Sequence, residues 1–199
     1  MKENDHHFFA YISRMRFINR WALMRNSYTE NIQEHSHMVA VLAHALGVIR
    51  RDIFHQPCDV NALATAALYH DASEILTGDL PTPIKYHNAE IMSAYHAVED
   101  LAVQKLLGML PPELRETYAD VLAEDKDGDI YPLVKAADKL SAYIKCIEER
   151  KAGNNEFLSA EAQTRAALEA SPLPEVQYYL EHIIPAFERD LDELGADGQ

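Results

Sequence analysis

Apolar side chains recur at the α-helical period along almost the whole of this 199-residue chain. Between Phe8 and Ile18, for example, they stand at positions 8, 9, 11, 12, 15 and 18, so they share one face of a helix. No segment shows convincing alternation of apolar and polar residues, the pattern of a half-buried β-strand, and no segment is repeated. We therefore predict an all-α fold, arranged as a single helical bundle.

Capping residues and helix breakers divide this pattern into roughly seven to nine helices. Thr29 and Asp59 are suitable N-caps and Asn88 is a suitable start of a helix, whereas Gly78 and Gly108 are suited to end helices. The predicted helices cover residues 8–18, 30–53, 60–78, 88–107, 112–122, 131–151, 159–170 and 175–194. The acidic segment 124–129 is predicted to be a loop rather than a linker. We expect one domain over residues 1–199, with a core at about 8–194 and a frayed tail at 195–199.

Three of the predicted helices place ionisable residues on faces that should be buried. His35 lies in line with the large apolar residues of the second helix. His70, Asp71 and Glu74 extend the apolar face of the third, and Asp138 lies beside the apolar row of a later helix. Because a buried ionisable group is costly unless it is paired, these side chains need a common partner.

A divalent metal ion would pair His35, His70, Asp71 and Asp138 together, since mixed nitrogen and oxygen ligands suit a transition metal. Taken singly, each of these residues is better explained as a hydrogen-bonded core residue. It is their combination from three helices that favours a metal. His37 belongs to the same helix as His35, and local sequence leaves the choice between them open. Four protein ligands would leave places on the ion for water or substrate, as in hydrolytic sites.

The charge of the chain is uneven. Its formal net charge is −14, which argues against a nucleic-acid partner. Between His6 and Thr29 there is no Asp or Glu, but there are four arginines: Arg14, Arg16, Arg20 and Arg25. This segment is either an anion-binding site or a basic helix face that pairs with acidic neighbours, and composition alone favours the second interpretation.

Cysteine usage and hydropathy bear on location. Cys58 and Cys146 form no motif, which is typical of proteins from a reducing compartment. The N-terminus lacks a signal-peptide pattern, and the longest uncharged apolar run, residues 38–49, is too short to cross a bilayer. We expect a cytoplasmic protein that does not associate with a membrane.

The order His35, His70-Asp71, Asp138 resembles the H…HD…D motif of the HD-domain metal-dependent phosphohydrolases. The resemblance extends over nearly the whole chain and is specific for the bacterial HD-domain 5′-deoxynucleotidases. The HD dipeptide is a weak signal by itself, whereas HDASE, TGDLPTP and the Arg-Trp pair in this order are a strong one. The segments that carry the resemblance are 18–26, 30–36, 69–86, 135–149 and 152–157.

The resemblance implies an HD fold and a homodimer. It implies hydrolysis of deoxyribonucleoside 5′-monophosphates to deoxynucleoside and phosphate, with selectivity for deoxyribose over ribose and tolerance of the base. The cofactor it implies is a divalent metal cation, with Co²⁺ favoured and Mn²⁺ or Cu²⁺ also serving.

Residue roles follow from the matched positions. The implied metal ligands are His35, His70, Asp71 and Asp138. Arg20 would act in catalysis by orienting the phosphate, Trp21 would pack on the sugar, and Glu74 and Asp79 would handle protons. Which of these two carboxylates is the general base stays open. The residues expected to contact the substrate are Arg20, Trp21, His35, Asp71, Asp79, Leu80, Pro81, Thr82 and Asp138.

Two kinds of alternative function remain at this point. One is another HD reaction, either dNTP triphosphohydrolysis or cyclic-nucleotide phosphodiester cleavage. The other is a non-catalytic nucleotide-sensing module with a structural metal. The short chain favours a small monophosphate substrate, and the presence of both Glu74 and Asp79 favours an enzyme.

Overall fold

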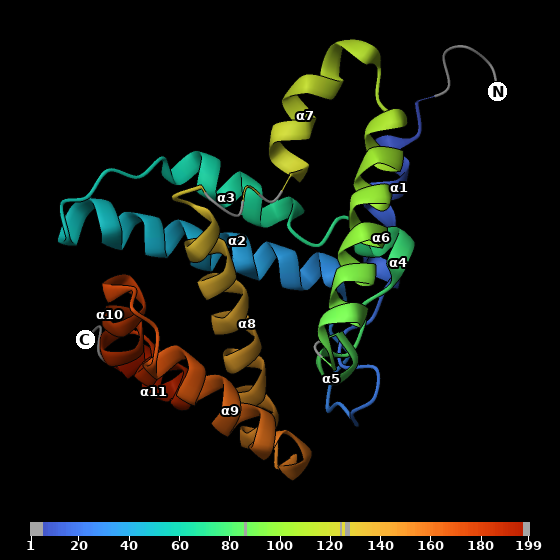
Figure 1. The fold of residues 1–199 in the computed structure, drawn as a ribbon. Helices are drawn as coiled ribbons and strands as arrows, with labels where there is room; N and C mark the ends of the chain where they lie inside the picture. Colours follow the sequence, from blue (N-terminus) through green and yellow to red (C-terminus); the bar gives the residue numbers. More distant parts are fainter. Residues whose placement is uncertain (1–5, 86, 124, 126–127, 197–199) are drawn as a thin grey trace.

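The computed structural model describes residues 6–85, 87–123, 125 and 128–196, and within these ranges the fold is all-α (Figure 1). The α-helices are α1 (Phe8–Ile12), α2 (Ile32–Val48), α3 (Val60–Tyr69), α4 (Glu74–Thr77), α5 (Thr82–Lys85), α6 (Ala89–Gly108), α7 (Arg115–Leu122), α8 (Tyr131–Lys151), α9 (Leu158–Glu169), α10 (Pro174–His182) and α11 (Leu191–Ala196). Shorter 3₁₀ turns are η1 (Ser13–Phe17), η3 (Pro112–Leu114), η4 (Asn155–Phe157) and η5 (Ile184–Glu188), and η2 (Ile49–Ile53) is a π-helical end of α2.

The main core lies where α8 packs against the paired helices α2 and α3 (Figure 1). Leu46 from α2, Leu63 from α3 and Leu140 from α8 are completely buried there. A Cβ at Gly47 would lie 3.0 Å from a methyl carbon of Leu63, so the glycine permits the close approach of α2 and α3. Helix α9 packs against α8, and α10 packs against α9 and α2.

A second apolar cluster joins α1, α6 and α7. Phe8 of α1 and Leu106 of α6 are fully buried in it, and Tyr118 of α7 packs its ring at 5.0 Å from the ring of Phe8. The cluster also includes Ala72, from the turn after α3. It therefore ties the residues next to the HD pair to the N-terminal helix.

The all-α prediction is confirmed, but the expected N-cap of the second helix is wrong. Asn31, not Thr29, caps α2, because its side chain accepts hydrogen bonds from the backbone of Gln33 and Glu34. Glu34 returns a contact to the backbone N–H of Asn31, which completes a capping box. Asp59 caps α3 as predicted, and Asn88 caps α6 at its predicted start.

The predicted helix over 60–78 is interrupted at the HD pair. Helix α3 ends at Tyr69, and tight turns lead through residues 70–73 into α4. Neighbours on a straight helix point about 100° apart, whereas the turn allows His70 and Asp71 to face one point. Gly78, with φ +75°, ends α4 as expected.

The N- and C-terminal helices also differ from the prediction. The first helix changes to 3₁₀ geometry at Ser13, whose hydroxyl bonds to the carbonyl of Ala10. The predicted helix at 175–194 is divided into α10, η5 and α11. Pro185 lies at this division and cannot donate the hydrogen bond that a continuous helix requires. Residues 197–199 of the expected tail and residues 124, 126 and 127 of the expected loop lie outside the described residues.

Residues 19–31 form a loop, here called the arginine loop, that begins and ends beside α2. An isolated antiparallel bridge joins Asn19 to Asn31. The backbone N–H of Arg20 donates to the carbonyl of Glu30 at 2.9 Å, and that of Ile32 donates to Ile18 at 2.9 Å. These hydrogen bonds hold the two ends of the loop together next to the first turn of α2. Among the helices that the structure describes, none is long and apolar enough to cross a membrane.

Candidate active site

Three separate elements bring the predicted metal ligands together. His35 comes from α2, His70 and Asp71 from the turn after α3, and Asp138 from α8. His35 Nε2 lies 3.1 Å from Asp138 Oδ1 and 3.5 Å from Asp71 Oδ2, and His70 Nε2 lies 3.1 Å from Asp71 Oδ2. Ligand atoms of His35, His70 and Asp138 all lie within 4.8 Å of one another. This is a compact set of nitrogen and oxygen donors.

The donor set fits a cation. His70 Nδ1 lies 2.8 Å from the carbonyl oxygen of Ala67, an acceptor, so in the neutral ring Nδ1 carries the proton and Nε2 offers its lone pair to the cluster. His35 Nε2 and His70 Nε2 are both buried and face the site carboxylates at 3.1–3.5 Å without forming a well-directed hydrogen bond. Buried polar atoms of this kind usually have a partner, and a divalent metal would supply one to both rings.

The charges of the cluster also favour a bound cation. Burial by itself would raise the pKa values of Asp71 and Asp138, but the adjacent histidines outweigh burial and hold both pKa values well below the usual range. Burial lowers the pKa of His70, yet Asp71 outweighs it and raises that pKa. The two carboxylates are therefore anionic at neutral pH and attract positive charge.

Exposure distinguishes His35 from His37. His35 is completely buried in the first half of α2, whereas His37 and the later His44 point to solvent. His35 Nδ1 lies 3.1 Å from Ser141 Oγ, so a residue of α8 also fixes the ring orientation. The stronger alignment of His35 with the apolar face was the useful signal in the sequence.

Two further carboxylates lie beside the cluster. Glu74, the first residue of α4, is buried, and its Oε2 has no hydrogen-bond partner. Burial, reinforced by Asp71 and Asp79, raises the pKa of Glu74 to about 10. Burial also raises the pKa of the half-buried Asp79, while nearby Arg20 opposes that change. Each carboxyl group therefore holds a proton more readily than an exposed carboxylate would, and Glu74 is protonated at neutral pH when no metal is bound.

Of the four arginines in the acid-free segment, only Arg20 reaches the cluster. Its Nη1 lies 2.7 Å from His35 Nδ1, and its Nη2 lies 3.9 Å from Asp138 Oδ1. Burial lowers the pKa of Arg20, but Glu30 and the site carboxylates outweigh burial and raise it. Arg14, Arg16 and Arg25 are exposed, and of these three Arg25 pairs with an acidic residue, Glu156.

Trp21 has an unusual backbone conformation. Its φ is +59°, in the left-handed region that costs a residue with a Cβ about 1 kcal/mol or more. Its ring packs on Phe157 with centroids 5.2 Å apart, and its indole N–H donates to Glu30 Oε2 at 3.1 Å. Its backbone N–H donates to the Asp79 carboxylate. These contacts hold a strained residue at the edge of the cluster.

The expected substrate loop leads away from Asp79 toward α5. Leu80 and Pro81 are half-buried, and Thr82 begins α5, although its side chain lies outside the described residues. At the other end of α5, Lys85 interacts electrostatically with Glu74 and pairs with Glu99 of α6 at 3.0 Å. Lys85 was not among the residues selected from the sequence.

Glu30 is the other site residue that sequence reasoning missed. It is the first acidic residue after the acid-free arginine segment, which is a signal that could have found it. The structure buries its carboxylate between Arg20 and Trp21, at the end of the arginine loop. It therefore supplies the negative charge that the segment itself lacks.

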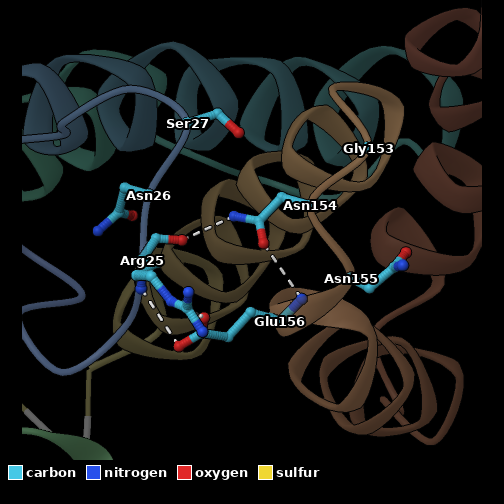
Figure 2. A pocket seen from close by; sticks show the side chains of 7 residues that line it. All are labelled: Arg25, Asn26, Ser27, Gly153, Asn154, Asn155 and Glu156. Carbon is cyan, nitrogen blue, oxygen red and sulfur yellow. Dashed lines mark hydrogen bonds and ion pairs between the residues drawn. The ribbon is translucent and has the colours of Figure 1, made fainter.

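The arginine loop is also fixed at its outer end. Asn154 Nδ2 donates to the carbonyl of Arg25 at 2.7 Å, and Glu156 accepts from both the backbone and the side chain of Arg25 (Figure 2). These residues border a polar cavity of about 680 Å³ lined by Arg25, Asn26, Ser27, Gly153, Asn154, Asn155 and Glu156. None of the four predicted metal ligands lines this cavity. The cavity therefore marks the place where the arginine loop is anchored, and it is not an entrance to the predicted metal site.

A further contact secures the same loop from within the protein. Lys145 of α8 is buried, donates to the carbonyl of Tyr28 at 2.8 Å, and pairs with the equally buried Glu149 at 2.5 Å. Glu149 in turn accepts from the backbone N–H of Ser27. A buried ion pair on α8 therefore holds the arginine loop at Ser27 and Tyr28.

Comparison with known proteins agrees with this geometry. Residues 7–187 match the family model described as 5′-deoxynucleotidase YfbR-like. The chain is 50% identical over 192 residues to the 5′-deoxynucleotidase YfbR of Shigella flexneri and of Escherichia coli, covering 96% of each protein.

Solved structures give the same fold. An HD-domain phosphohydrolase from Listeria innocua superimposes with a TM-score of 0.82 at 26% identity, covering 94% of this chain and 90% of that chain. A cyanophage S-2L HD phosphohydrolase, DatZ, bound to dA and one catalytic Zn²⁺ ion, gives a TM-score of 0.58 at 26% identity and covers 90% and 94% of the two chains.

Proposed function

Because the chain belongs to the YfbR-like 5′-deoxynucleotidase family, we propose that it is a metal-dependent hydrolase that converts deoxyribonucleoside 5′-monophosphates to deoxynucleoside and phosphate. The observation that carries the proposal is the position of the largely buried Arg20 beside two converging imidazole rings and two anionic carboxylates. A phosphate monoester needs cations around its oxygens, and this cluster offers an arginine and a cation site together.

His35, His70, Asp71 and Asp138 would hold the divalent cation. When bound, such an ion neutralises phosphate charge and lowers the pKa of a nearby water molecule. Co²⁺ is our choice of ion by resemblance to the family, with Mn²⁺ or Cu²⁺ as substitutes. Because Asp71, Asp138 and His35 surround the same point, they would also lie against the bound phosphate.

Arg20 would bind the non-bridging phosphate oxygens. Its Nη1 already faces Glu30 and His35, and its Nη2 lies nearest Asp138, so Nη2 is the nitrogen best placed to contact a phosphate at the cluster. A guanidinium binds phosphate through directed N–H donors and stabilises charge that develops as the P–O5′ bond breaks.

Glu74 and Asp79 would handle the protons. Water attacks phosphorus, the P–O5′ bond breaks, and a proton lost by the water must be balanced by one gained at O5′. The raised pKa values of both carboxyl groups support a role in proton transfer, because each holds a proton more readily than an exposed carboxyl group. The pH dependence of kcat in the variants Glu74→Gln and Asp79→Asn would show which of the two is the base and which is the acid.

Selectivity for deoxyribose would come from Trp21, with the loop of Asp79, Leu80, Pro81 and Thr82 closing the other side of the nucleotide. The strained backbone of Trp21 and its fixed indole support a rigid wall against the sugar. A 2′-hydroxyl buried against such a wall without a partner costs about 1–3 kcal/mol, or roughly tenfold to a hundredfold in kcat/KM. The base would make few specific contacts, so we expect the enzyme to accept different bases.

We also propose a homodimer in the cytoplasm. Helix α6 exposes Val98 and Leu101, which are 49% and 69% accessible, and a second copy could cover them. Both cysteines are free thiols in the structure, in agreement with a reducing compartment. Sedimentation equilibrium and cell fractionation test these two points.

The deciding experiment measures products released from dAMP, AMP, dATP and a cyclic nucleotide. The protein is first treated with a chelator and then supplied with Co²⁺, Mn²⁺, Cu²⁺, Zn²⁺ or Mg²⁺. We expect phosphate release from dAMP, little from AMP, and none with chelator present. Triphosphate from dATP would favour the triphosphohydrolase alternative, and dAMP binding without phosphate release would favour the nucleotide-sensing module.

A further inference from the structure

Glu30 connects the two residues proposed to recognise phosphate and sugar. A single oxygen, Oε2, accepts from Arg20 Nη1 at 2.8 Å and from Trp21 Nε1 at 3.1 Å. The side chain of Glu30 is 11% accessible and that of Arg20 is 13% accessible. A shared, largely dehydrated acceptor of this kind makes strong charge-assisted hydrogen bonds.

The backbone of Glu30 strengthens the same connection. Its carbonyl accepts from the backbone N–H of Arg20 at 2.9 Å, so Glu30 holds this residue at both its backbone and its guanidinium. The next residue but one, Ile32, begins α2, the helix that carries His35. Glu30 therefore links Arg20 and Trp21 to the start of α2, the helix that positions the proposed metal ligand His35.

Neither partner could keep its orientation equally well without Glu30. The indole N–H of Trp21 is a single donor with one direction, and the residue already has a strained φ of +59°. Arg20 would otherwise be free to turn Nη1 toward the acidic cluster, where Asp138 and Asp71 attract it. By engaging Nη1, Glu30 leaves Nη2 facing the cluster.

We infer that Glu30 is a positioning residue, whose one carboxylate oxygen couples the orientation of the phosphate-binding Arg20 to that of the sugar-contacting Trp21. Glu30 contacts neither the phosphate nor the sugar. Phosphate binding and discrimination between deoxyribose and ribose consequently depend on the same buried group. The inference rests on the proposed function, because it assigns both partners a place in the nucleotide site.

The first test is Glu30→Gln, with Glu34→Gln as its matched control. The control makes the same change four residues later, and glutamine at this exposed position retains the capping box of α2. Since Trp21 is the only tryptophan, intrinsic fluorescence reports its environment without labelling. We expect a longer-wavelength emission and stronger acrylamide quenching in Glu30→Gln, and wild-type behaviour in Glu34→Gln.

The second test is kinetic. We expect Glu30→Gln to reduce kcat/KM for dAMP by about tenfold to a hundredfold, the usual effect of losing a charge-assisted hydrogen bond. The ratio of kcat/KM for dAMP to that for AMP should fall about tenfold. A group that merely stabilised the fold would lower both substrates together and leave this ratio unchanged. Glu30→Asp, which keeps the charge but shortens the side chain, should lower the ratio in the same way and serves if Glu30→Gln does not fold.

A double-mutant cycle with Trp21→Phe separates the two hydrogen bonds. Phenylalanine keeps a ring but has no N–H for Glu30 to accept. In the Trp21→Phe background, we expect Glu30→Gln to weaken dAMP hydrolysis further through Arg20, with no additional change in the dAMP to AMP ratio.

Unchanged emission in Glu30→Gln, or a dAMP to AMP ratio equal to that of wild type in both Glu30 variants, would overturn the inference. An additive effect of the two substitutions on the ratio would also overturn it. Failure of the proposed function looks different: wild-type protein would then release no phosphate from dAMP under any cation. In that case the fluorescence of Glu30→Gln, compared with Glu34→Gln, still decides whether Glu30 orients Trp21.

Discussion

The imidazole rings of His35 and His70 face each other with their centroids 5.3 Å apart, although they come from different helical elements. Each ring directs a buried Nε2 toward Asp71, and His35 Nε2 also lies beside Asp138. Two imidazoles and two anionic carboxylates that converge in this way form an arrangement that a divalent cation stabilises.

Metal binding should therefore depend on His35 and not on its neighbour His37. His35→Gln should lose the bound cation, whereas His37→Gln, an exposed position two residues later in the same helix, should keep it. Elemental analysis after dialysis against Co²⁺ measures this directly. Equal cation content in the two variants would show that the buried cluster is not the metal site.

Removal of the cation should also destabilise the wild-type protein. At a free cation concentration a hundredfold above the dissociation constant, bound metal adds about 2.7 kcal/mol. For a chain of this size the unfolding midpoint should then fall by about 5–10 °C when a chelator is added. His35→Gln should show no such chelator effect, and differential scanning calorimetry provides the comparison.

Long-range constraints explain which parts of the fold the sequence could not predict. Periodicity was sufficient for α2 and α8, because each buries a continuous apolar face. It could not predict the interruption at His70, since the local pattern continues through the turn. That turn is stabilised by the contacts His70 and Asp71 make with residues from α2 and α8, which local sequence does not contain.

In the candidate site too, the residues that depend on long-range contacts could not be predicted from the local sequence. The grouping of His35, His70, Asp71 and Asp138 was predictable because these residues are anomalous on apolar helix faces. Glu30 could be singled out only as the first acidic residue after the arginine segment. Its partners were not predictable, because nothing in its immediate sequence shows that the arginine loop returns to place it against Arg20 and Trp21. The partners of a loop residue become evident only when the closure of the loop is known.

Arg20→Ala should reduce catalysis while sparing the metal. The guanidinium contacts His35 at Nδ1, on the side of the ring away from the cluster, so its removal leaves the Nε2 donors in place. We expect kcat/KM for dAMP to fall by about a hundredfold, as for loss of one phosphate-stabilising group. Arg25→Ala is a control from the same loop, with its side chain almost fully exposed. Loss of Co²⁺ from Arg20→Ala would instead indicate a structural role for this arginine in the metal cluster.

Glu74 should make the metal-free protein less stable as the pH rises. Its pKa is about 10 in the folded protein but close to 4.5 when unfolded, so folding favours the protonated form. This contribution is fully present below pH 4.5 and is lost as the pH rises toward 10. Glu74→Gln cannot ionise and should be more stable than wild type by on the order of 2 kcal/mol at pH 8.5, with little difference at pH 5.

Urea unfolding in the presence of a chelator measures the difference between Glu74→Gln and wild type at the two pH values. Adding Co²⁺ should reduce that difference, because a nearby cation favours the ionised carboxylate. A difference that is the same at pH 5 and pH 8.5 would mean that Glu74 is already ionised in the metal-free protein.

The buried pair Lys145 and Glu149 should be essential for the stability of the arginine loop. Lys145→Met would leave the Glu149 carboxylate buried beside Ser27 without its ammonium partner. An uncompensated buried charge typically costs 3–5 kcal/mol, or roughly that much free energy of unfolding in this variant. Urea unfolding of the metal-loaded protein gives the value.

The exposed pair Arg165 and Glu169 on α9 is the matched control, because it has the same spacing of four residues but both side chains are more than half exposed. Arg165→Met should change the free energy of unfolding by about 0.5 kcal/mol or less. Lys145→Met should also shift the emission of Trp21, since Lys145 and Glu149 hold the loop that carries this indole. A loss of stability with unchanged emission and unchanged dAMP to AMP ratio would show that the pair stabilises α8 and does not act on the loop.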